Sequence, residues 1–489
     1  MKHNGESIVQ IRSIEAESGK LVGVGSGFFV EPEKVVTNIH AVYGDGLVSA
    51  KSVDGESVWE VDGVTTFDLK NDLVILKVLA EGKPLPLGNS DAVQIGERVF
   101  TLGFPETEYK VTTGIIQGIR GDSKKFWVDA EYVGGMSGGP MLNSKSEVIG
   151  VAAGSTGTYG VAVPSNALKV LLSQSELTEP LAQFRKKDPI RAYTYYAQGQ
   201  FKFLHGAHAE AIDAFDKTVE LNPEFAAAYG ICGLAKLHLG QFEEVKENAE
   251  EAQHYYHEAV ADFNTANKLD AEEGLGQDDR ILGYAKTKLG ESEVAKGNVE
   301  QALNYYNEAI ADFNKAIKLN SEYAGAYSNR GYTKTKLAQS AASQGDQEQA
   351  QEYYCAAIDD CTEALRLNSA EYAEDSLMRH YAKLLLEPED TDTYRNRGDA
   401  KFYFGKLETD QGNMEQTESH YRDAIEDYTE TINLKPDCAL AYYSRSLVKQ
   451  ALGLQEEARV DYEKARELNP DVGKQTEQKH QDIEKPQDN

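Results

Sequence analysis

Residues 134–140, "GGMSGGP", place Ser137 inside a glycine-rich turn. A serine becomes an effective nucleophile only when a base takes its proton, an acid orients that base, and backbone N–H groups stabilise the oxyanion. Glycine-rich turns that contain a serine are common, so these seven residues do not establish catalysis. The base and the acid have to be sought in the same domain.

Two histidines, His3 and His40, precede residue 190. His3 lies in the first residues of the chain, which we expect to fray. His40 lies in "VVTNIHAV", directly after an apolar run that predicts a strand, where a side chain can be held rigidly. His40 is therefore the candidate general base.

The acid has several candidates between His40 and Ser137. Asp72 opens "NDLVILKV", so its carboxylate stands at the mouth of a predicted buried strand and can be aimed at an imidazole N–H. Asp68, four residues earlier, is the alternative. The remaining aspartates of this segment include Asp45, Asp54, Asp62, Asp91, Asp122 and Asp129.

The elements that must position these residues are short strands. Up to about residue 175, runs rich in Val, Ile and aromatic residues alternate with Gly, Asp, Asn or Pro, a pattern that predicts a sandwich or a pair of small barrels. We assign residues 1–178 to this first, all-β domain. Residues 179–190, which are polar and contain Pro180 and Pro189, are expected to form a linker.

Residues 191–470 form long amphipathic segments with an internal repeat. An alanine, an aromatic or other bulky residue four positions later and "LNP" or a relative recur, and the last two framing alanines are 34 residues apart. The spacings of 48 to 50 residues exceed 34 by about four helical turns, so both helices of a hairpin would be longer by two turns. This predicts an all-α solenoid of about six repeats, with one extra helix at 373–386 and a disordered tail at 471–489. The framing alanines are Ala211, Ala259, Ala309, Ala357, Ala424 and Ala458.

The first domain resembles the HtrA (Deg) branch of the chymotrypsin-like serine proteases. "GSGFFV" with "VVTNIHAV", "NDLVILKV", "LGFP" with "VTTGIIQGI", "GGMSGGPMLNSKSEVIGV" and "YGVAVPSNAL" follow the family's order over residues 20–170. The resemblance implies a double β-barrel with His40 as general base, Asp72 as orienting acid and Ser137 as nucleophile. The N–H groups of Gly135 and Ser137 would form the oxyanion hole.

Met136 stands where this family usually carries Asn, and no PDZ domain follows. The resemblance therefore leaves open how the oxyanion loop is ordered. It also suggests a specificity pocket with Glu131 near its floor. Glu131 could select Lys or Arg beside the cleaved bond, or point to solvent and leave a pocket for a small or aliphatic residue. One wall of this pocket would consist of Ala152, Ala153 and Gly154.

The second region resembles the tetratricopeptide repeat, whose stacked hairpins present a concave face to peptides or partner helices. Residues Tyr195, Gly199, Ala211, Phe215 and Pro223 carry the resemblance in the first unit. "YSNRG" and "YRNRG" repeat an Asn-Arg pair, which makes Asn329, Arg330, Asn396 and Arg397 candidates for a partner site.

The composition restricts the classes of partner. The formal net charge is −30, which disfavours nucleic acid and anionic membrane surfaces. The N-terminal residues show no apolar signal core, no window reaches the length of a membrane span, and the four cysteines have no metal-ligand spacing. We expect a cytoplasmic protein that needs no cofactor or metal.

The sequence thus predicts a serine endopeptidase whose repeats recruit a protein substrate or sense a regulatory partner. The alternative is a catalytically inactive protease fold that acts as an interaction scaffold.

Overall fold

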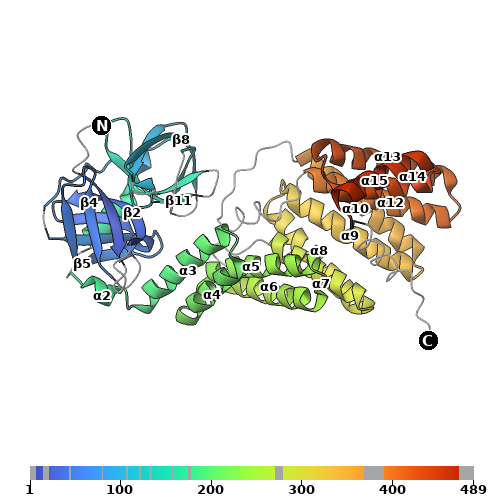
Figure 1. Cartoon of the computed structure of the whole chain (residues 1–489), viewed down its shortest axis with the longest axis horizontal. Helices are drawn as coiled ribbons and strands as arrows, with labels where there is room; N and C mark the ends of the chain where they lie inside the picture. The colour runs from blue at the N-terminus through green and yellow to red at the C-terminus, as the bar shows by residue number, and fades with distance from the viewer. Residues whose placement is uncertain are drawn as a thin grey trace. The chain divides into compact units, whose positions relative to one another are not determined.

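The structure is a computed structural model and describes residues 7–14, 21–42, 46–79, 81–105, 108–120, 123–130, 135–155, 159–174, 178–269, 279–367 and 390–472. The chain divides into two compact units, Met1–Ala228 and Tyr229–Asn489, and each is described by itself. Figure 1 shows strands and the helices up to α4 in the first unit, and helices in the second.

The first unit begins with a closed antiparallel barrel in the order β1-β2-β3-β6-β5-β4. The apolar run of β6 is buried except at Lys77, and it pairs with β3 so that Asn38 at the end of β3 lies opposite Leu73 at the start of β6. The residues just after β3 and just before β6 therefore meet at the same edge of the barrel. The strands are β1 (Ile8–Ile14), β2 (Leu21–Glu31), β3 (Lys34–Asn38), β4 (Val48–Ser52), β5 (Val58–Asp68) and β6 (Leu73–Val78).

A second closed barrel follows in the order β10-β11-β12-β9-β8-β7. The prediction of an all-β double barrel is thereby confirmed. The 3₁₀ turns η1 (Ile39–Val42) and η2 (Ser90–Ala92) and the helix α1 (Ser165–Ser173) complete the strand-rich part. The strands are β7 (Arg98–Gly103), β8 (Lys110–Arg120), β9 (Lys125–Val128), β10 (Pro140–Leu142), β11 (Val148–Ser155) and β12 (Gly160–Pro164).

The segment predicted to be a linker is ordered and packs on the first barrel. It holds α2 (Leu181–Phe184) and the start of α3 (Asp188–Leu204). Helix α2 contacts β5, as Figure 1 shows, and Phe184 is fully buried in the apolar cluster of this barrel. Glu179 and Val64 exchange two backbone hydrogen bonds of 2.8 Å, which adds a bridge to the edge of β5.

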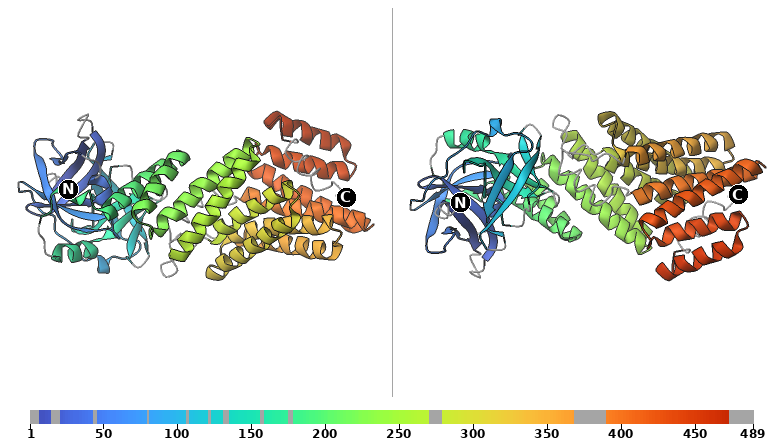
Figure 2. Two further views of the ribbon diagram at one scale, coloured as in Figure 1. Left: turned by 90° about the horizontal axis from the view of Figure 1, so that it is seen from below. Right: turned by 90° about the horizontal axis from the view of Figure 1, so that it is seen from above.

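Helix α3 pairs with α4 (His208–Leu221), and the helices of the second unit follow as further hairpins. Successive helices from α7 to α10 pack side by side (Figure 2). Helices α9 and α10 have 20 and 21 residues, whereas α14 and α15 have 13 and 14, a difference of about two turns per helix. The prediction of an all-α repeat region after the barrels is confirmed.

Helix α5 (Ala226–Val245) begins three residues before the second unit. The helices that follow are α6 (Ala249–Leu269), α7 (Asp279–Ala295), α8 (Val299–Leu319), α9 (Ala324–Ser343), α10 (Gln347–Leu367), α12 (Asp390–Asp410), α13 (Met414–Leu434), α14 (Ala439–Ala451) and α15 (Gln455–Leu468). Glycines on the first helix of a hairpin seat aromatic rings of the second. A Cβ on Gly290, for example, would lie 2.4 Å from the ring of Tyr306. The helix expected at 373–386 and the tail beyond residue 472 lie outside the described residues.

Candidate active site

The pairing of β3 with β6 brings His40 and Asp72 together. His40 lies in η1, two residues after β3, and Asp72 directly precedes β6. The Nδ1 atom of His40 is 2.5 Å from Oδ2 of Asp72, a short contact of the kind that charge-assisted hydrogen bonds make.

The backbone fixes the Asp72 carboxylate from the other side. Its Oδ1 atom accepts hydrogen bonds from the N–H groups of Ile39 (3.0 Å) and His40 (3.2 Å), while Asn38 Nδ2 donates to the Asp72 carbonyl (2.8 Å). Asp72 has a φ of 57°, in the left-handed region, where Asp is one of the few residues found. It is only 7% exposed, so both carboxylate oxygens are committed to the turn that carries the imidazole.

This pairing sets the protonation behaviour of His40. Burial alone would lower the pKa of His40, but the charge of Asp72 and its hydrogen bond outweigh burial and raise the pKa above its usual value. The alternative acid, Asp68, has another role. It accepts hydrogen bonds from the backbone N–H (3.1 Å) and the side-chain amide (2.7 Å) of Asn71, and thus closes the turn that leads to Asp72.

Ser137 lies in a loop whose backbone conformation requires glycine at two positions. Gly135 and Gly138 have φ values of 96° and 86°. A Cβ on Gly135 would lie 2.4 Å from the Phe104 carbonyl oxygen, and one on Gly138 would lie 2.1 Å from the Ser26 carbonyl oxygen. The loop therefore runs against the backbone of its neighbours without space for side chains at these positions.

Strand β2 connects this loop to the turn that carries His40. The N–H of Ser26 donates to the Ser137 carbonyl at 2.8 Å. A Cβ on the preceding Gly25 would lie 2.7 Å from the Ala41 Cβ and 3.5 Å from the Ser137 carbonyl oxygen. The residue next to His40 and the backbone of Ser137 thus contact the same point of β2, which brings the three predicted triad residues to one edge of the first barrel.

The hydroxyl of Ser26 was missed by the sequence analysis, which read "GSGFFV" only as a strand. Ser26 Oγ donates to the Gly135 carbonyl (2.7 Å) and accepts from the Phe104 N–H (2.9 Å). Met136, whose side chain occupies the position where the resemblance leads us to expect Asn, is fully buried. The loop is thus held by an apolar anchor and by a hydroxyl that bridges the two barrels.

The expected pocket wall is adjacent to this loop. The N–H of Gly138 donates to the Ala152 carbonyl (2.7 Å), and the N–H of Ala152 donates to the Gly139 carbonyl (2.8 Å). Ala152 is buried, while Ala153 and Gly154 on the same strand β11 are partly exposed. Glu131 lies outside the described residues.

The candidate arginines of the repeats are paired within their own hairpins. Arg330 donates through Nε (2.8 Å) and Nη2 (2.6 Å) to Asp360, and Arg397 donates through Nη2 (2.6 Å) to Asp427. A ligand carboxylate would have to compete with these aspartates. Asn329 and Asn396 are 7% and 6% exposed, and Nδ2 of the former and Oδ1 of the latter have no hydrogen-bond partner among the described residues.

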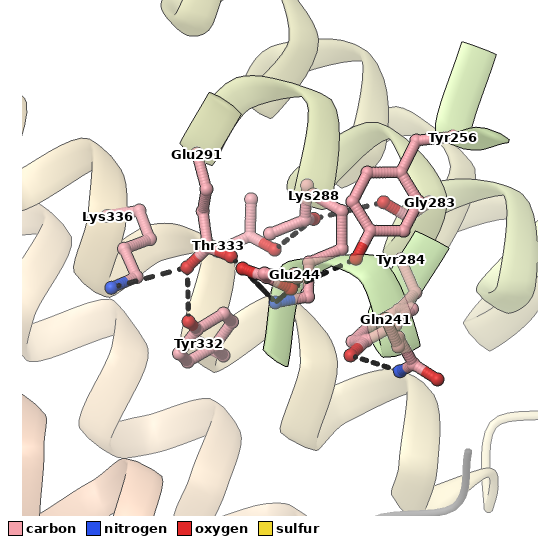
Figure 3. A network of polar contacts seen from close by, with 11 residues as sticks. Gln241, Glu244, Tyr256, Gly283, Tyr284, Lys288, Glu291, Tyr332, Thr333 and Lys336 are labelled. Atoms are coloured by element: carbon pink, nitrogen blue, oxygen red, sulfur yellow. Dashed lines mark hydrogen bonds and ion pairs between the residues drawn. The ribbon is translucent and has the colours of Figure 1, made fainter. Parts of the chain in front are cut away.

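A buried polar network links helices α5, α6, α7 and α9 of the repeats (Figure 3). At its centre, Lys288 Nζ lies 3.1 Å from Glu244 Oε2 and 3.0 Å from Glu291 Oε2. Tyr256 donates to Glu244 at 2.9 Å, and Tyr332 donates to Glu291. These charges are paired inside the repeats, so they hold neighbouring hairpins together rather than forming a ligand site.

Within the described ranges, no three His, Cys, Asp or Glu side chains are grouped so that they could hold a metal ion. None of the helices in the described part of the chain combines the length and the apolarity needed to cross a membrane.

Comparison with known proteins agrees with this geometry. Residues 25–151 match the model of the trypsin-like peptidase domain, residues 297–337 that of the TPR repeat, and residues 439–472 that of the tetratricopeptide repeat. Residues 25–151 include His40, Asp72 and Ser137.

Three curated relatives match the N-terminal part. "Putative serine protease HhoB" of Synechocystis is 39% identical over 142 residues, which are 26% of this chain and 34% of the relative. "Anti-sigma-I factor RsgI9" of Acetivibrio thermocellus is 32% identical over 162 residues, 32% of this chain and 22% of the relative. "Probable periplasmic serine endoprotease DegP-like" of Chlamydia trachomatis is 36% identical over 167 residues, 31% of this chain and 33% of the relative.

The chain thus spans about a third or less of the length of these relatives. On this sequence similarity and on its two barrels, the N-terminal part is a trypsin-like, HtrA-type serine protease domain, and the chain joins it to tetratricopeptide repeats.

Proposed function

We propose that the protein is a serine endopeptidase in which His40, Asp72 and Ser137 form the catalytic triad. The observation that carries the proposal is the His40–Asp72 pair, because its carboxylate accepts both the imidazole Nδ1–H and the backbone N–H groups of the same turn. This arrangement leaves Nε2 of His40 as the atom that acts on Ser137.

In this mechanism, His40 Nε2 takes the proton of the Ser137 hydroxyl while Oγ attacks the carbonyl carbon of the scissile bond. The negative charge on the carbonyl oxygen is stabilised by the N–H groups of Gly135 and Ser137. The imidazolium, stabilised by Asp72, then protonates the leaving amine, and an acyl-enzyme forms. Water, deprotonated by His40, hydrolyses this ester and restores the serine.

The substrate we propose is a protein or peptide chain, and the repeats recruit it or bind a partner that controls hydrolysis. Stacked hairpins commonly bind extended peptides or helices. We assign Asn329 and Asn396 to such a contact, because one amide atom of each side chain has no hydrogen-bond partner among the described residues. Arg330 and Arg397 would join them if a ligand carboxylate replaced Asp360 and Asp427 as their partners. The pocket whose wall is formed by Ala152, Ala153 and Gly154 determines which substrate side chain is accepted beside the cleaved bond.

We also propose a cytoplasmic location, without nucleic acid or membrane as partner. The net charge of −30 would be repelled by both. No disulfide joins the four cysteines, all of which lie in the described residues, and a reducing compartment keeps cysteines in this state.

The first test is covalent labelling of the full-length protein with a fluorophosphonate probe, together with hydrolysis of casein. We expect labelling and hydrolysis in the wild type and neither in Ser137→Ala. Hydrolysis at the wild-type rate in Ser137→Ala would contradict the assignment of the nucleophile.

The second candidate function is the inactive scaffold. The name of the Acetivibrio thermocellus relative, an anti-sigma factor, favours it, since that name describes a regulator. A full-length protein that folds but neither reacts with the probe nor cleaves casein would support the scaffold. Labelling that depends on Ser137 would exclude it.

A further inference from the structure

Arg185, just after α2, bonds the end of the turn that carries His40. Its Nε donates to the Val42 carbonyl at 2.7 Å and its Nη1 to the Gly46 carbonyl at 2.6 Å. Val42 is the last residue of η1, two positions after His40. One guanidinium therefore bonds the backbone on both sides of residues 43–45, and its rigid fork suits two fixed acceptors.

Strand β1 holds the same stretch of backbone from the barrel itself. Ser13 Oγ donates to the Ala41 carbonyl at 3.0 Å, and the Ile14 N–H donates to the Leu47 carbonyl at 2.9 Å. The barrel thus bonds the outer two of these four carbonyl groups, and Arg185 bonds the inner two. The inner carbonyl groups therefore depend on a side chain that lies beyond residue 151, where the match to the peptidase domain ends.

The segment that presents this guanidinium is anchored on β5. Glu179 and Val64 exchange two backbone hydrogen bonds of 2.8 Å. A Cβ on the adjacent Gly63 would lie 2.2 Å from the Glu179 carbonyl oxygen, so the two backbones meet without space for a side chain. Phe184 is fully buried, and its ring lies 5.2 Å from that of Phe67. The guanidinium is thus presented from a well-packed support, as a positioning group has to be.

Helix α3 adds an apolar support to the same turn. It contacts η1, and its residue Ile190 is 2% exposed. Ile190 and Tyr193 belong to the same apolar cluster as Ile39 and Val42 of η1. The residues that join the barrels to the repeats therefore contact η1 through both polar and apolar groups.

The position of the imidazole depends on both ends of η1, which has four residues. At its start, the N–H groups of Ile39 and His40 donate to Asp72 Oδ1 at 3.0 and 3.2 Å. At its end, the Val42 carbonyl accepts from Arg185. In so short a turn, a movement of the end is passed on to the start, and a misplacement of about 1 Å in a catalytic site can lower the rate about 100-fold.

We propose that Arg185 is a positioning residue that fixes the turn of His40, so that the segment joining the barrels to the repeats is part of the scaffold of the active site. The proposal rests on the proposed function. All the residues that carry it lie in the compact unit Met1–Ala228.

The test compares Arg185→Ala and Arg185→Lys with the same two changes at Arg191, in the full-length chain. Arg191 is exposed and donates through Nη1 to Asp188 of its own helix at 3.0 Å, so it is a matched control. Lysine keeps the positive charge but lacks the planar fork that bonds two carbonyl groups at once. The melting temperature of each variant shows whether the fold is kept.

The first property measured is hydrolysis of a peptide substrate. In Arg185→Ala, kcat should fall about 10-fold with little change in KM, because the lost charged hydrogen bonds position the base and not the substrate. Guanidinium ions, added far below denaturing concentrations, should restore part of this kcat by occupying the vacated position. Sodium chloride at the same ionic strength should not restore it.

The second property is the hydrogen bond between His40 and Asp72, followed by proton NMR in a Ser137→Ala background. The short contact of 2.5 Å to a carboxylate should move the Nδ1–H signal of His40 far downfield. In Arg185→Ala this signal should broaden or disappear, and guanidinium ions should restore it. The Arg191 variants should keep both the signal and kcat.

A wild-type kcat or an unchanged Nδ1–H signal in Arg185→Ala would overturn the proposal, and so would equal losses in the Arg191 variants. If Arg185→Ala does not fold, the comparison of Arg185→Lys with Arg191→Lys decides in the same way. The NMR signal needs no hydrolysis, so it reports on Arg185 even if the wild type fails to cleave peptides. In that case the proposed function fails separately.

Discussion

Replacement of Ser26 by alanine tests how the oxyanion loop is ordered. The change removes the donor to the Gly135 carbonyl (2.7 Å) and leaves the Phe104 N–H without its acceptor (2.9 Å). An unsatisfied buried N–H costs about 1–3 kcal/mol, and the lost hydrogen bond about 0.5–1.5 kcal/mol. The free energy of unfolding should therefore fall by about 1.5–4.5 kcal/mol.

Part of the stability lost in Ser26→Ala is lost in the loop that presents the N–H groups of Gly135 and Ser137. If the Gly135 peptide samples other orientations, the rate of acylation falls. An increase of about 1.4 kcal/mol in the activation free energy lowers the rate about 10-fold. Complete loss of one oxyanion donor lowers kcat about 10²–10³-fold. We expect a decrease of about 10-fold in kcat with little change in KM, because the oxyanion forms only in the transition state.

The assay is the acylation burst with a chromogenic ester, measured beside chemical denaturation. Ser165→Ala is the matched control, since the buried Ser165 Oγ also donates to a backbone carbonyl, that of Gly88 at 3.0 Å, outside the loop of Ser137. Ser165→Ala should lose stability and keep the wild-type burst rate. If Ser26→Ala loses stability but keeps the wild-type burst rate as well, the Ser26 hydroxyl does not order the oxyanion loop.

Two further predictions follow from the same contacts. The raised pKa of His40 means that activity, which needs the neutral imidazole, should disappear as the pH falls through a value above 6.5. Asp72→Asn removes the carboxylate charge that raises this pKa, while the burial that lowers it remains. The acid limb of kcat/KM should therefore move to lower pH, and the rate should fall by on the order of 10⁴-fold. An acid limb that stays in place would contradict the pairing of His40 with Asp72. The second prediction concerns two fragments, one ending at residue 178 and one ending at residue 228. The shorter fragment lacks Phe184, Ile190 and Tyr193, so it should have a lower melting temperature and react more slowly with fluorophosphonate. Equal melting temperatures and labelling rates would show that the barrel does not need the first hairpin.

The sequence allowed the fold class and the triad candidates to be predicted because their signals are local. A run such as "NDLVILKV" predicts a buried strand by itself, and the period of the repeats is visible along the chain. The choice of Asp72 over Asp68 followed from the position of each beside that strand, and the structure brings Asp72 to His40 while Asp68 accepts from Asn71.

The contacts that support these residues are not local, and the sequence analysis missed them. Ser26 and Gly135 are 109 residues apart and belong to different barrels, and no pattern in "GSGFFV" indicates which carbonyl the hydroxyl meets. Tyr193 received no role in the sequence analysis, because aromatic residues at helical spacing usually belong to the core between helices. Its packing against the cluster of Ile39 and Val42 depends on how α3 lies on the barrel, which periodicity does not encode.

The domain boundary therefore falls at different residues when it is placed by sequence and when it is placed by packing. By composition, the helical region begins near residue 190, and the match to the peptidase domain ends at residue 151. By contacts, Arg185 holds the turn of His40, Phe184 is buried against the first barrel, and the compact unit ends at Ala228. Helix α3 of the first hairpin packs on the turn that carries His40, so a rearrangement of this hairpin would disturb its apolar contacts with Ile39 and Val42. The first hairpin belongs to the same compact unit as the barrels and contacts η1, so it is the part of the helical region through which a bound partner could most directly affect His40.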